Sequence, residues 1–496
     1  MTGIDAVRSR KITRLASGDS PRVLELCSGC GGMSLGLKTA GFELRAHVEC
    51  DPLAAATYAV NFGPTSGEGQ GEWARPRDMN TCSPETLARE FGLHEDAADS
   101  FDILAAGLPC QAFARIGRSK LRSIAGDKKA FKKDQRATLY KRFLEYVSAT
   151  RPLGILIENV PDILNFGGHN VPEEICGTLD SLGYRTAYTL LNAAFYGVPQ
   201  LRERLILLGI DVSLGVEPRF PDPTHSIDLP SGYEGSRNVA LKYVPDRGSH
   251  FRPIPGVTEE LPQAVSVRSA LRDLPFISEH FTNPTAMKRR RVCDHRAYRK
   301  VGRISDYARA MRDWPGFEGE KDLDAHVVRV TPRDFEIFKR MPHGSDYPIA
   351  IKIAEGIFAE KLEALSASDV ASRIKTKAYR KLRSATVPPY DPGKFPNKWW
   401  KLAPSCPSRT LTAHIGKDTY SHIHYDSRQK RTISVREAAR LQSFPDGFRF
   451  AGQMNAAFRQ IGNAVPPLLA LAVARVLKET LLEGAAMSKR RKSTVA

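Results

Sequence analysis

The sequence lacks any long apolar run. No stretch of its 496 residues approaches the roughly 18 apolar residues of a membrane-spanning helix. Residues 1–20 also lack the apolar stretch of a signal peptide. Cysteine is scarce, with 8 in the whole chain, which excludes a disulfide scaffold. We therefore expect a soluble, cytoplasmic protein with reduced thiols and no membrane partner.

Positive charge is in excess. The chain has 73 Lys and Arg against 55 Asp and Glu, a formal charge of +18, and its 42% hydrophobic residues are enough for a globular core. The basic residues concentrate at 115–136, 288–312 and 373–383, and tyrosines lie in the last two of these windows. Basic clusters with aromatic residues suit a nucleic acid, because cations bind phosphates and rings stack on bases.

Residues 21–211 alternate apolar runs with helix-like stretches. This pattern predicts an α/β domain with a doubly wound, mostly parallel, Rossmann-like sheet. We expect a helix over 138–147, between two of the strands. The expected strands are Val23–Leu26, Phe101–Leu104, Gly154–Ile157 and Leu205–Leu208.

The rest of the chain divides into segments of different composition. Residues 1–20 form a basic N-terminal segment, and 212–455 form a second, smaller, irregular domain rich in Pro, Gly and basic residues. Within it we expect a helix at 435–441, and we expect Trp399 and Trp400 to belong to a core. Residues 456–482 return to the first domain with a helix at 467–477, and 483–496 are expected to be a disordered basic tail.

A glycine-rich turn follows the first expected strand. The segment from Leu26 to Gly32 reads Leu-Cys-Ser-Gly-Cys-Gly-Gly, and such a turn lets the backbone approach a ligand at a helix N-terminus. Glu49 ends the next strand, placed to hold ribose hydroxyls. Because Ser34 breaks the strict GxGxxG pattern, an adenosine cofactor other than a nicotinamide is favoured. The alternative is a tight turn without a ligand.

Two cysteines of this turn, Cys27 and Cys30, have C-x-x-C spacing. A structural zinc site needs a second ligand pair, and no suitably spaced pair is present. A redox pair would compete with the glycines for the same turn. We therefore interpret both cysteines as small packing residues and expect no metal.

A second group of residues carries chemistry. Cys110 follows the strand at 101–104 and precedes the basic window at 115–136, which favours a reactive thiolate. Glu158 ends the next strand. Since ligands of open α/β sheets bind at the carboxyl ends of strands, the two side chains should face one crevice. Arg202 and Arg204 alternate with other residues just before the last expected strand and could project toward one side. A segment of this kind is more often a surface ion-pair segment.

In this order the motifs resemble those of the C5-cytosine DNA methyltransferases, in the bacterial restriction-modification form. The resemblance covers about 23–204 and 407–466. Besides the glycine-rich turn, its motifs are Pro109-Cys110-Gln111, Glu158-Asn159-Val160, Gln200-Leu-Arg-Glu-Arg204, Arg409-Thr-Leu-Thr, Arg436-Glu-Ala-Ala-Arg-Leu-Gln-Ser-Phe-Pro445 and Gln460-Ile-Gly-Asn-Ala-Val-Pro466.

The resemblance implies a reaction. A thiolate of Cys110, with Gln111 beside it, would add to C6 of cytosine, and C5 would then take the methyl group of S-adenosylmethionine. Glu158 would protonate N3, which suits a buried carboxyl that can hold a proton. Arg202 and Arg204 would hold O2 or neighbouring groups, and water would remove the C5 proton. The cytosine must first be flipped out of the duplex.

The same resemblance implies the cofactor site for S-adenosylmethionine. Glu49 would bind the ribose, Asp78 the adenine amino group, and Asn463 would lie near the methionine moiety. Cys27 stands where the family often has Phe, and Cys50 where a large apolar residue often covers the adenine. The implied cofactor-binding residues are Leu26, Cys27, Ser28, Gly29, Gly31, Gly32, Glu49, Cys50, Asp78, Pro109 and Asn463.

Double-stranded DNA is the implied partner. Arg115, Arg118 and Arg136 lie in the window that resembles the family's DNA-closing loop, and 212–455 in the place of its target-recognition domain. A monomer is usual for such enzymes. A restriction endonuclease acting on the same site, a phage origin and an orphan enzyme all remain open, as does the target sequence.

Three alternatives remain. An RNA cytosine-5 methyltransferase would need similar catalytic residues, but the large basic middle region favours DNA. A catalytically inactive nucleic-acid-binding protein of the same fold is disfavoured by the intact Cys110, Glu158 and arginines. A nicotinamide-dependent oxidoreductase is suggested only by the first turn.

Overall fold

The computed structural model describes residues 3–64, 69–93, 96–108, 139–166, 168–230, 232–245, 248–365 and 376–495. The chain forms two compact units. The first comprises 1–198, 202–264 and 464–496, and the second comprises 199–201 and 265–463.

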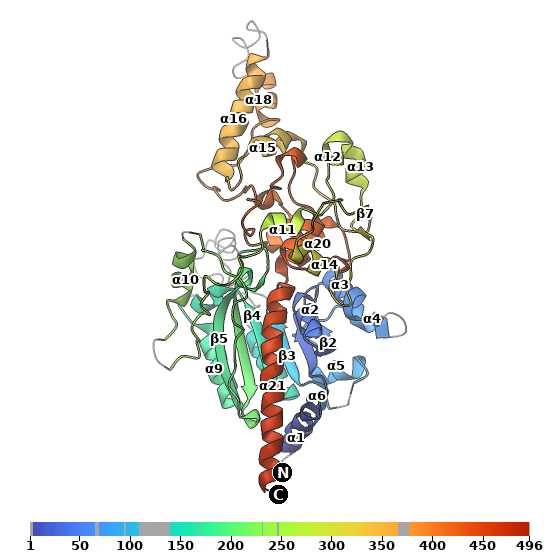
Figure 1. The fold of residues 1–496 in the computed structure, drawn as a ribbon, viewed down its shortest axis with the longest axis vertical. Helices are drawn as coiled ribbons and strands as arrows, with labels where there is room; N and C mark the ends of the chain where they lie inside the picture. The colour runs from blue at the N-terminus through green and yellow to red at the C-terminus, as the bar shows by residue number, and fades with distance from the viewer. Residues whose placement is uncertain are drawn as a thin grey trace. The chain divides into compact units, whose positions relative to one another are not determined.

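A six-stranded sheet organises the first unit (Figure 1). Its strand order is β2-β1-β3-β4-β6-β5, and only β6 runs antiparallel to its neighbours. The order in which strands are added reverses at β1, which lies between β2 and β3, so a crevice at the carboxyl ends of these parallel strands is the expected ligand position. The strands are β1 (Arg22–Leu26), β2 (Glu43–Val48), β3 (Ile103–Gly107), β4 (Gly154–Asn159), β5 (Tyr184–Asn192) and β6 (Glu203–Asp211).

The predicted α/β class is confirmed, and one strand was missed. Both faces of the sheet are buried. Successive residues of a strand point to opposite faces, so one strand contributes to two apolar clusters. Leu24 and Leu26 of β1 belong to one apolar cluster, and Val23 belongs to the other. β5 was not predicted, because Arg185, Thr186 and Thr189 interrupt its apolar pattern.

Helices cover both faces of this sheet. α8 and α9 contribute Phe143 and Ile175 to the first cluster, and α1, α2 and α21 pack into the second. α3 begins at Pro52 because Asp51 caps it through the amides of Leu53 and Ala54. The helices are α1 (Gly3–Ala16), α2 (Gly32–Thr39), α3 (Pro52–Phe62), α4 (Gly69–Ala74), α5 (Pro84–Glu90), α6 (Ala97–Ser100), α8 (Leu139–Thr150), α9 (Val171–Ser181), α10 (Tyr233–Leu241) and α21 (Pro467–Val495).

α21 is longer than the sequence indicated. The prediction of a disordered tail from 483 is wrong for the described residues, because the helix continues to Val495. Leu481 and Ala485 are buried, so the apolar face persists beneath the basic residues. Figure 1 shows α21 running alongside the sheet. A Cβ on Gly36 of α2 would lie 2.5 Å from the backbone N of Leu471, so the two helices pack closely.

The second unit consists of short helices and loops around its own core. Trp399 is fully buried and stacks on Tyr420 with ring centroids 4.6 Å apart, which confirms its predicted core role. The elements are α11 (Val267–Leu271), α12 (Glu279–Thr282), α13 (Pro284–Arg289), α14 (Asp306–Arg312), α15 (Phe335–Arg340), α16 (Tyr347–Glu363), α18 (Lys377–Ser384), α19 (Val435–Leu441), α20 (Met454–Asn463), β7 (Arg296–Ala297) and β8 (Asp322–Leu323).

The boundaries of the units differ from the predicted domain boundaries. Residues 212–264 belong to the first unit, because Phe251 bridges to Tyr188 of β5 and α10 packs on the 3-10 helix Pro161–Asn165. Residues 456–463 belong to the second unit, because α20 packs against the 3-10 helix Ala413–Gly416. Within the described ranges, no helix is long and apolar enough to cross a membrane.

Buried ion pairs stabilise the second unit around α19. Arg440 lies between Asp273 and Asp446, with Nε 2.5 Å from Asp446 Oδ1 and Nη2 3.1 Å from Asp273 Oδ2. Arg431 pairs with Glu437 in the same way, at 2.6 Å. Removing one member would leave an unpaired buried charge, which costs several kcal/mol. The motif from Arg436 to Pro445 therefore contributes to the core of this unit.

Candidate active site

The turn between β1 and α2 requires its glycines. Gly29 and Gly31 have φ of +57° and +93°, where residues with a side chain are strained. A Cβ on Gly31 would lie 2.2 Å from Cε2 of Phe62, and a Cβ on Gly32 would lie 2.3 Å from the carbonyl oxygen of Val465. Gly29 has no atom within 4 Å of that position, so its surface is open to a ligand.

Glu49 lies directly beside this turn. Its Oε2 accepts a hydrogen bond from the amide of Gly29 at 2.8 Å, and its Oε1 accepts from the amide of Asp51 at 2.7 Å. Burial raises the pKa of Glu49 and the two amides oppose that change. The Cys50 side chain also hydrogen-bonds to this carboxylate, and the acceptor positions that remain suit ribose hydroxyls.

Metal binding or redox chemistry at the C-x-x-C pair would have to involve one buried cysteine, Cys30, and one partly buried cysteine, Cys27. Burial raises the pKa of the Cys27 and Cys30 thiols. The thiolate that either chemistry requires is therefore disfavoured. Among the described residues no group of His, Cys, Asp and Glu could hold a metal ion. Cys50 is exposed, so no large apolar side chain covers the site at that position.

Asp78 lies on a loop tied to the same strand end. The amide of Arg77 donates to the carbonyl of Glu49 at 2.7 Å, and Nε of Arg142 donates to the carbonyl of Met79 at 3.0 Å. The Asp78 side chain is exposed, and its charge contributes to the raised pKa of Cys27. The predicted adenine contact of Asp78 is compatible with this position and stays a prediction.

Glu158 and Arg204 form an ion pair on neighbouring antiparallel strands. Arg204 Nε lies 2.7 Å from Glu158 Oε1, and each side chain is 11% exposed. β4 places Glu158 opposite Gly107, at the carboxyl end of β3. The pair therefore lies at the sheet edge where the nucleophile is predicted.

Arg202 has another environment. It is 2% exposed, and its Nη2 donates to the carbonyl of Ala464 at 3.1 Å. Asn463 is the last residue of α20, in the second unit, and is exposed. The predicted contacts of Arg202 with the base and of Asn463 with the cofactor stay predictions.

Several predicted residues lie outside the described residues. One described range ends at Leu108. The carbonyl of Leu108 accepts a hydrogen bond at 3.4 Å from Nδ2 of Asn159, the residue after Glu158. The next described range begins at Leu139. The undescribed predictions are Pro109, Cys110, Gln111, Arg115, Arg118 and Arg136.

The sequence analysis missed a buried polar network beneath the turn. Ser34 donates to Glu25 and lies 2.7 Å from the hydroxyl of Tyr58. Burial raises the pKa of Glu25 to about 8. His47 stacks on Tyr58 and lies 3.0 Å from Ser28 Oγ. The signal was an acid inside the apolar strand Val-Leu-Glu-Leu, a position where an unpaired carboxylate is costly.

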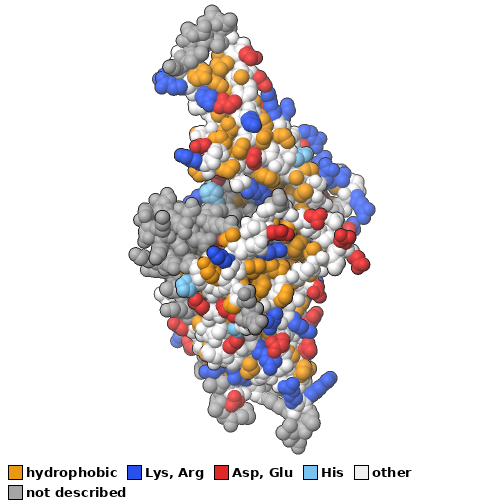
Figure 2. Space-filling view, turned by 90° about the vertical axis from the view of Figure 1, so that its left-hand side faces the viewer, with side chains coloured by type: hydrophobic (Ala, Val, Ile, Leu, Met, Phe, Trp, Pro, Cys, Tyr) orange, Lys and Arg blue, Asp and Glu red, His pale blue; other side chains and the backbone are white. Residues whose placement is uncertain are grey.

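On the face drawn in Figure 2, Lys and Arg side chains are interspersed with those of Asp and Glu. The described part of one basic window forms α18, whose Tyr379 and Leu382 pack on the core of the second unit. Its Lys377, Arg380 and Lys381 are exposed. This helix thus presents a basic face.

Comparison with known proteins defines the class. The family model for C-5 cytosine-specific DNA methylases matches residues 21–479. The chain belongs to this family of S-adenosylmethionine-dependent methylases and is a DNA (cytosine-5-)-methyltransferase.

Individual relatives span nearly the whole chain. A candidate type II methyltransferase of Oceanobacillus iheyensis, M.OihORF3336P, is 37% identical and aligns over 94% of this chain and 96% of its own length. Type II methyltransferase M.AgeI of Thalassovita gelatinovora is 29% identical and aligns over 92% of this chain and 99% of its own length. The crystal structure of a candidate prophage-encoded DNA modification methyltransferase from E. coli matches with a TM-score of 0.57 at 23% identity, covering 93% and 99%, and shares the fold.

Proposed function

We propose that this enzyme methylates C5 of a flipped-out cytosine within a specific DNA sequence, through a covalent bond between Cys110 and C6. The family supplies the reaction class. The single observation that carries the assignment of the site is the Glu158–Arg204 pair, which places an acid and a cation at the carboxyl end of β4, next to the end of β3 that leads to Cys110.

The turn and Glu49 fit S-adenosylmethionine. The open surface at Gly29 admits a ligand close to the backbone, and Glu49 retains acceptors for ribose hydroxyls. Asp78 would accept from the adenine amino group, and Asn463 would lie near the methionine moiety. When bound, this cofactor supplies an electrophilic methyl group. Glu49, Asp78 and Asn463 would hold it beside the base.

Cys110 starts the reaction as the thiolate. Its sulfur forms a bond to C6, and the π electron pair of the C5–C6 bond shifts toward C4 and N3 as N3 gains a proton, which makes C5 nucleophilic. We propose that Gln111 takes part in catalysis beside this sulfur and that Pro109 contributes to the cofactor site. After C5 has gained the methyl group, water removes the C5 proton, the C6–S bond breaks, and the thiolate returns.

Glu158 and Arg204 must exchange partners when the base enters. Without a base, Arg204 Nε contacts Glu158 Oε1, whereas protonation of N3 requires that carboxyl to contact the base instead. We propose that the cytosine ring separates the pair, so that Arg204 moves to O2 and Glu158 binds a proton shared with N3. Arg202 would support O2 from its position at Ala464.

Double-stranded DNA is the proposed substrate, and residues 212–455 would read its sequence. Arg115, Arg118 and Arg136 would bind phosphates when the target base is flipped. Because the relatives are named as type II methyltransferases, we propose a protective role opposite a restriction endonuclease that cuts the same site. We propose a monomer acting in the bacterial cytoplasm.

The test is to express the chain in a host lacking cytosine methylation and to map modified cytosines in its DNA at single-base resolution. Modification of one short recurring sequence, absent with Cys110→Ser and present with the exposed control Cys293→Ser, supports the proposal. Unmodified DNA would contradict it. Methylated RNA in the same cells would then assign the activity to RNA, and its absence would indicate an inactive binding protein.

A further inference from the structure

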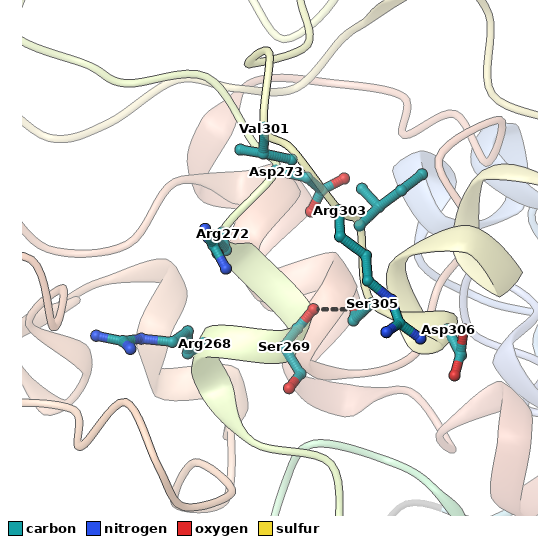
Figure 3. Close-up of a pocket in the computed structure, with 9 residues that line it drawn as sticks. Arg268, Ser269, Arg272, Asp273, Val301, Arg303, Ser305 and Asp306 are labelled. Carbon is teal, nitrogen blue, oxygen red and sulfur yellow. Dashed lines mark hydrogen bonds between the residues drawn. The ribbon is translucent and has the colours of Figure 1, made fainter.

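We propose that a cleft in the second unit binds a backbone phosphate of the DNA substrate (Figure 3). This inference rests on the DNA-recognition role proposed for residues 212–455. The cleft has a volume of about 320 Å³ and lies between α11 and the segment that leads into α14. Its lining residues are Arg268, Ser269, Arg272, Asp273, Val301, Arg303, Ile304, Ser305 and Asp306.

Three arginines give the cleft a positive charge. Arg268, Arg272 and Arg303 are exposed, and within the described ranges their guanidinium groups make no ion pair. Figure 3 shows the first two on the α11 side and Arg303 on the opposite segment, toward Asp306. Asp306 is the one exposed carboxylate of the lining. The lining thus carries three exposed cations and one exposed carboxylate.

The other acid of the lining does not balance these arginines. Asp273 is 2% exposed and lies 2.6 Å from Nη2 of Arg312. Nη2 of Arg440 lies 3.1 Å from the same carboxylate, and Arg440 also pairs with Asp446. This group of two acids and two arginines is neutral as a set. The surplus charge of the cleft is therefore carried by its three exposed guanidinium groups.

Hydrogen bonds fix the backbone of both walls. Ser305 Oγ accepts from the amide of Ala308 at 3.0 Å, and it donates to the carbonyl of Ser269 at 2.6 Å. The amide of Arg268 donates to the carbonyl of Pro404 at 2.9 Å. The backbone around Arg268 and Ser305 is thus held in place, which reduces the conformational entropy lost when an anion binds.

The chemistry of the lining favours a phosphodiester. Guanidinium groups match phosphate oxygens in geometry, and serine hydroxyls line the same space. Val301 and Ile304 are the apolar members, and no ring is available for a base to stack on. A contact of this kind positions the duplex and carries no sequence information.

The experiment measures binding of the full chain to a fluorescent DNA duplex by anisotropy, at several salt concentrations. The test variant is Arg268→Gln with Arg303→Gln. The control is Arg89→Gln with Lys489→Gln, which removes the same charge from exposed positions in the first unit. We expect the test variant to bind about tenfold more weakly or worse, and the slope of log K against log salt to fall by about 1 to 2.

Phosphate-ethylation interference gives the second readout. With the wild type, ethylation of one or two phosphates should block binding, and this block should disappear with the test variant only. Equal losses in both double variants, or unchanged interference, would overturn the cleft assignment. If the wild type binds and methylates DNA and the test variant behaves as the wild type does, the cleft assignment is refuted and the proposed function is not. A wild type that binds no DNA refutes the proposed function as well.

Discussion

Arg204 Nε lies 2.7 Å from Oε1 of Glu158, on two adjacent antiparallel strands that are both largely shielded from water. The pair occupies the sheet edge beside the end of β3. In the proposed mechanism, the base enters between this acid and this cation. Several expected results follow from this arrangement and from the turn that faces the cofactor.

Replacing Arg204 by Gln should lower kcat. Without its cation, the charge that develops on the cytosine ring is left without its partner, and removal of one such group typically costs about 100- to 1000-fold. Affinity for S-adenosylmethionine should stay within about twofold. Arg185→Gln on β5, which removes an exposed arginine paired with Glu217, is the control and should retain activity. An equal loss of cofactor affinity with Arg204→Gln would contradict the assigned role.

Replacing Glu49 by Ala should weaken cofactor binding more than DNA binding. The variant loses a carboxylate that orders the amides of Gly29 and Asp51 and is predicted to accept ribose hydroxyls. Calorimetry should show an affinity for S-adenosylmethionine lower by tenfold or more, since each hydrogen bond to a charge contributes about 1.5–3 kcal/mol. Glu43→Ala, at the exposed start of β2, is the control. Equal losses for cofactor and DNA would count against the ribose role.

Gly31→Ala should destabilise the first unit. The new methyl group would meet the ring of Phe62 at 2.2 Å, at a φ of +93°. The left-handed conformation alone costs about 1–2 kcal/mol, and the clash adds to this value. Urea denaturation should show the loss. Gly71→Ala, where the added methyl meets nothing within 4 Å inside α4, should be neutral or stabilising. A stability of Gly31→Ala equal to the wild type would show that the turn can relax.

A histidine behind β5 should make stability depend on pH. Burial lowers the pKa of His250, but hydrogen bonds to Asp180 and Glu173 outweigh burial and raise it. A raised pKa contributes stability that is present below the unfolded value, about 6.5, and is lost as pH rises through the folded value. His250→Gln should therefore lower Tm more at pH 6 than at pH 8.5. A difference that is the same at both pH values would refute this linkage.

The sequence predicted the sheet domain because β1, β3, β4 and β6 contain apolar runs that can be recognised locally. The helix at 435–441 was predicted to the residue, since Ser434 and Glu437 form a capping box at its start. The direction of β6 was not predicted. It depends on the 3-10 turn Ala193–Tyr196, which takes the place of a crossover helix between β5 and β6.

Long-range packing explains the other differences. The C-terminal segment was predicted to be a disordered tail from its basic residues. The contacts that stabilise the helix there come from α1 and α2, over 400 residues away in sequence. In the site, the sequence pattern grouped Glu49 with the turn, whereas Arg204 was grouped with Glu158 only through the family resemblance. The Glu25 network was missed, since its partners come from three different elements.

The most direct measurement uses a duplex with 5-fluorocytosine at the target position, together with S-adenosylmethionine. Fluorine at C5 cannot be removed as a proton is, so the bond between Cys110 and C6 should persist after methyl transfer. We predict a protein–DNA adduct that survives denaturation, with a cross-linked peptide containing Cys110, and no adduct with Cys110→Ser. Full methylation of ordinary DNA by Cys110→Ser, or an adduct at another residue, would contradict the mechanism.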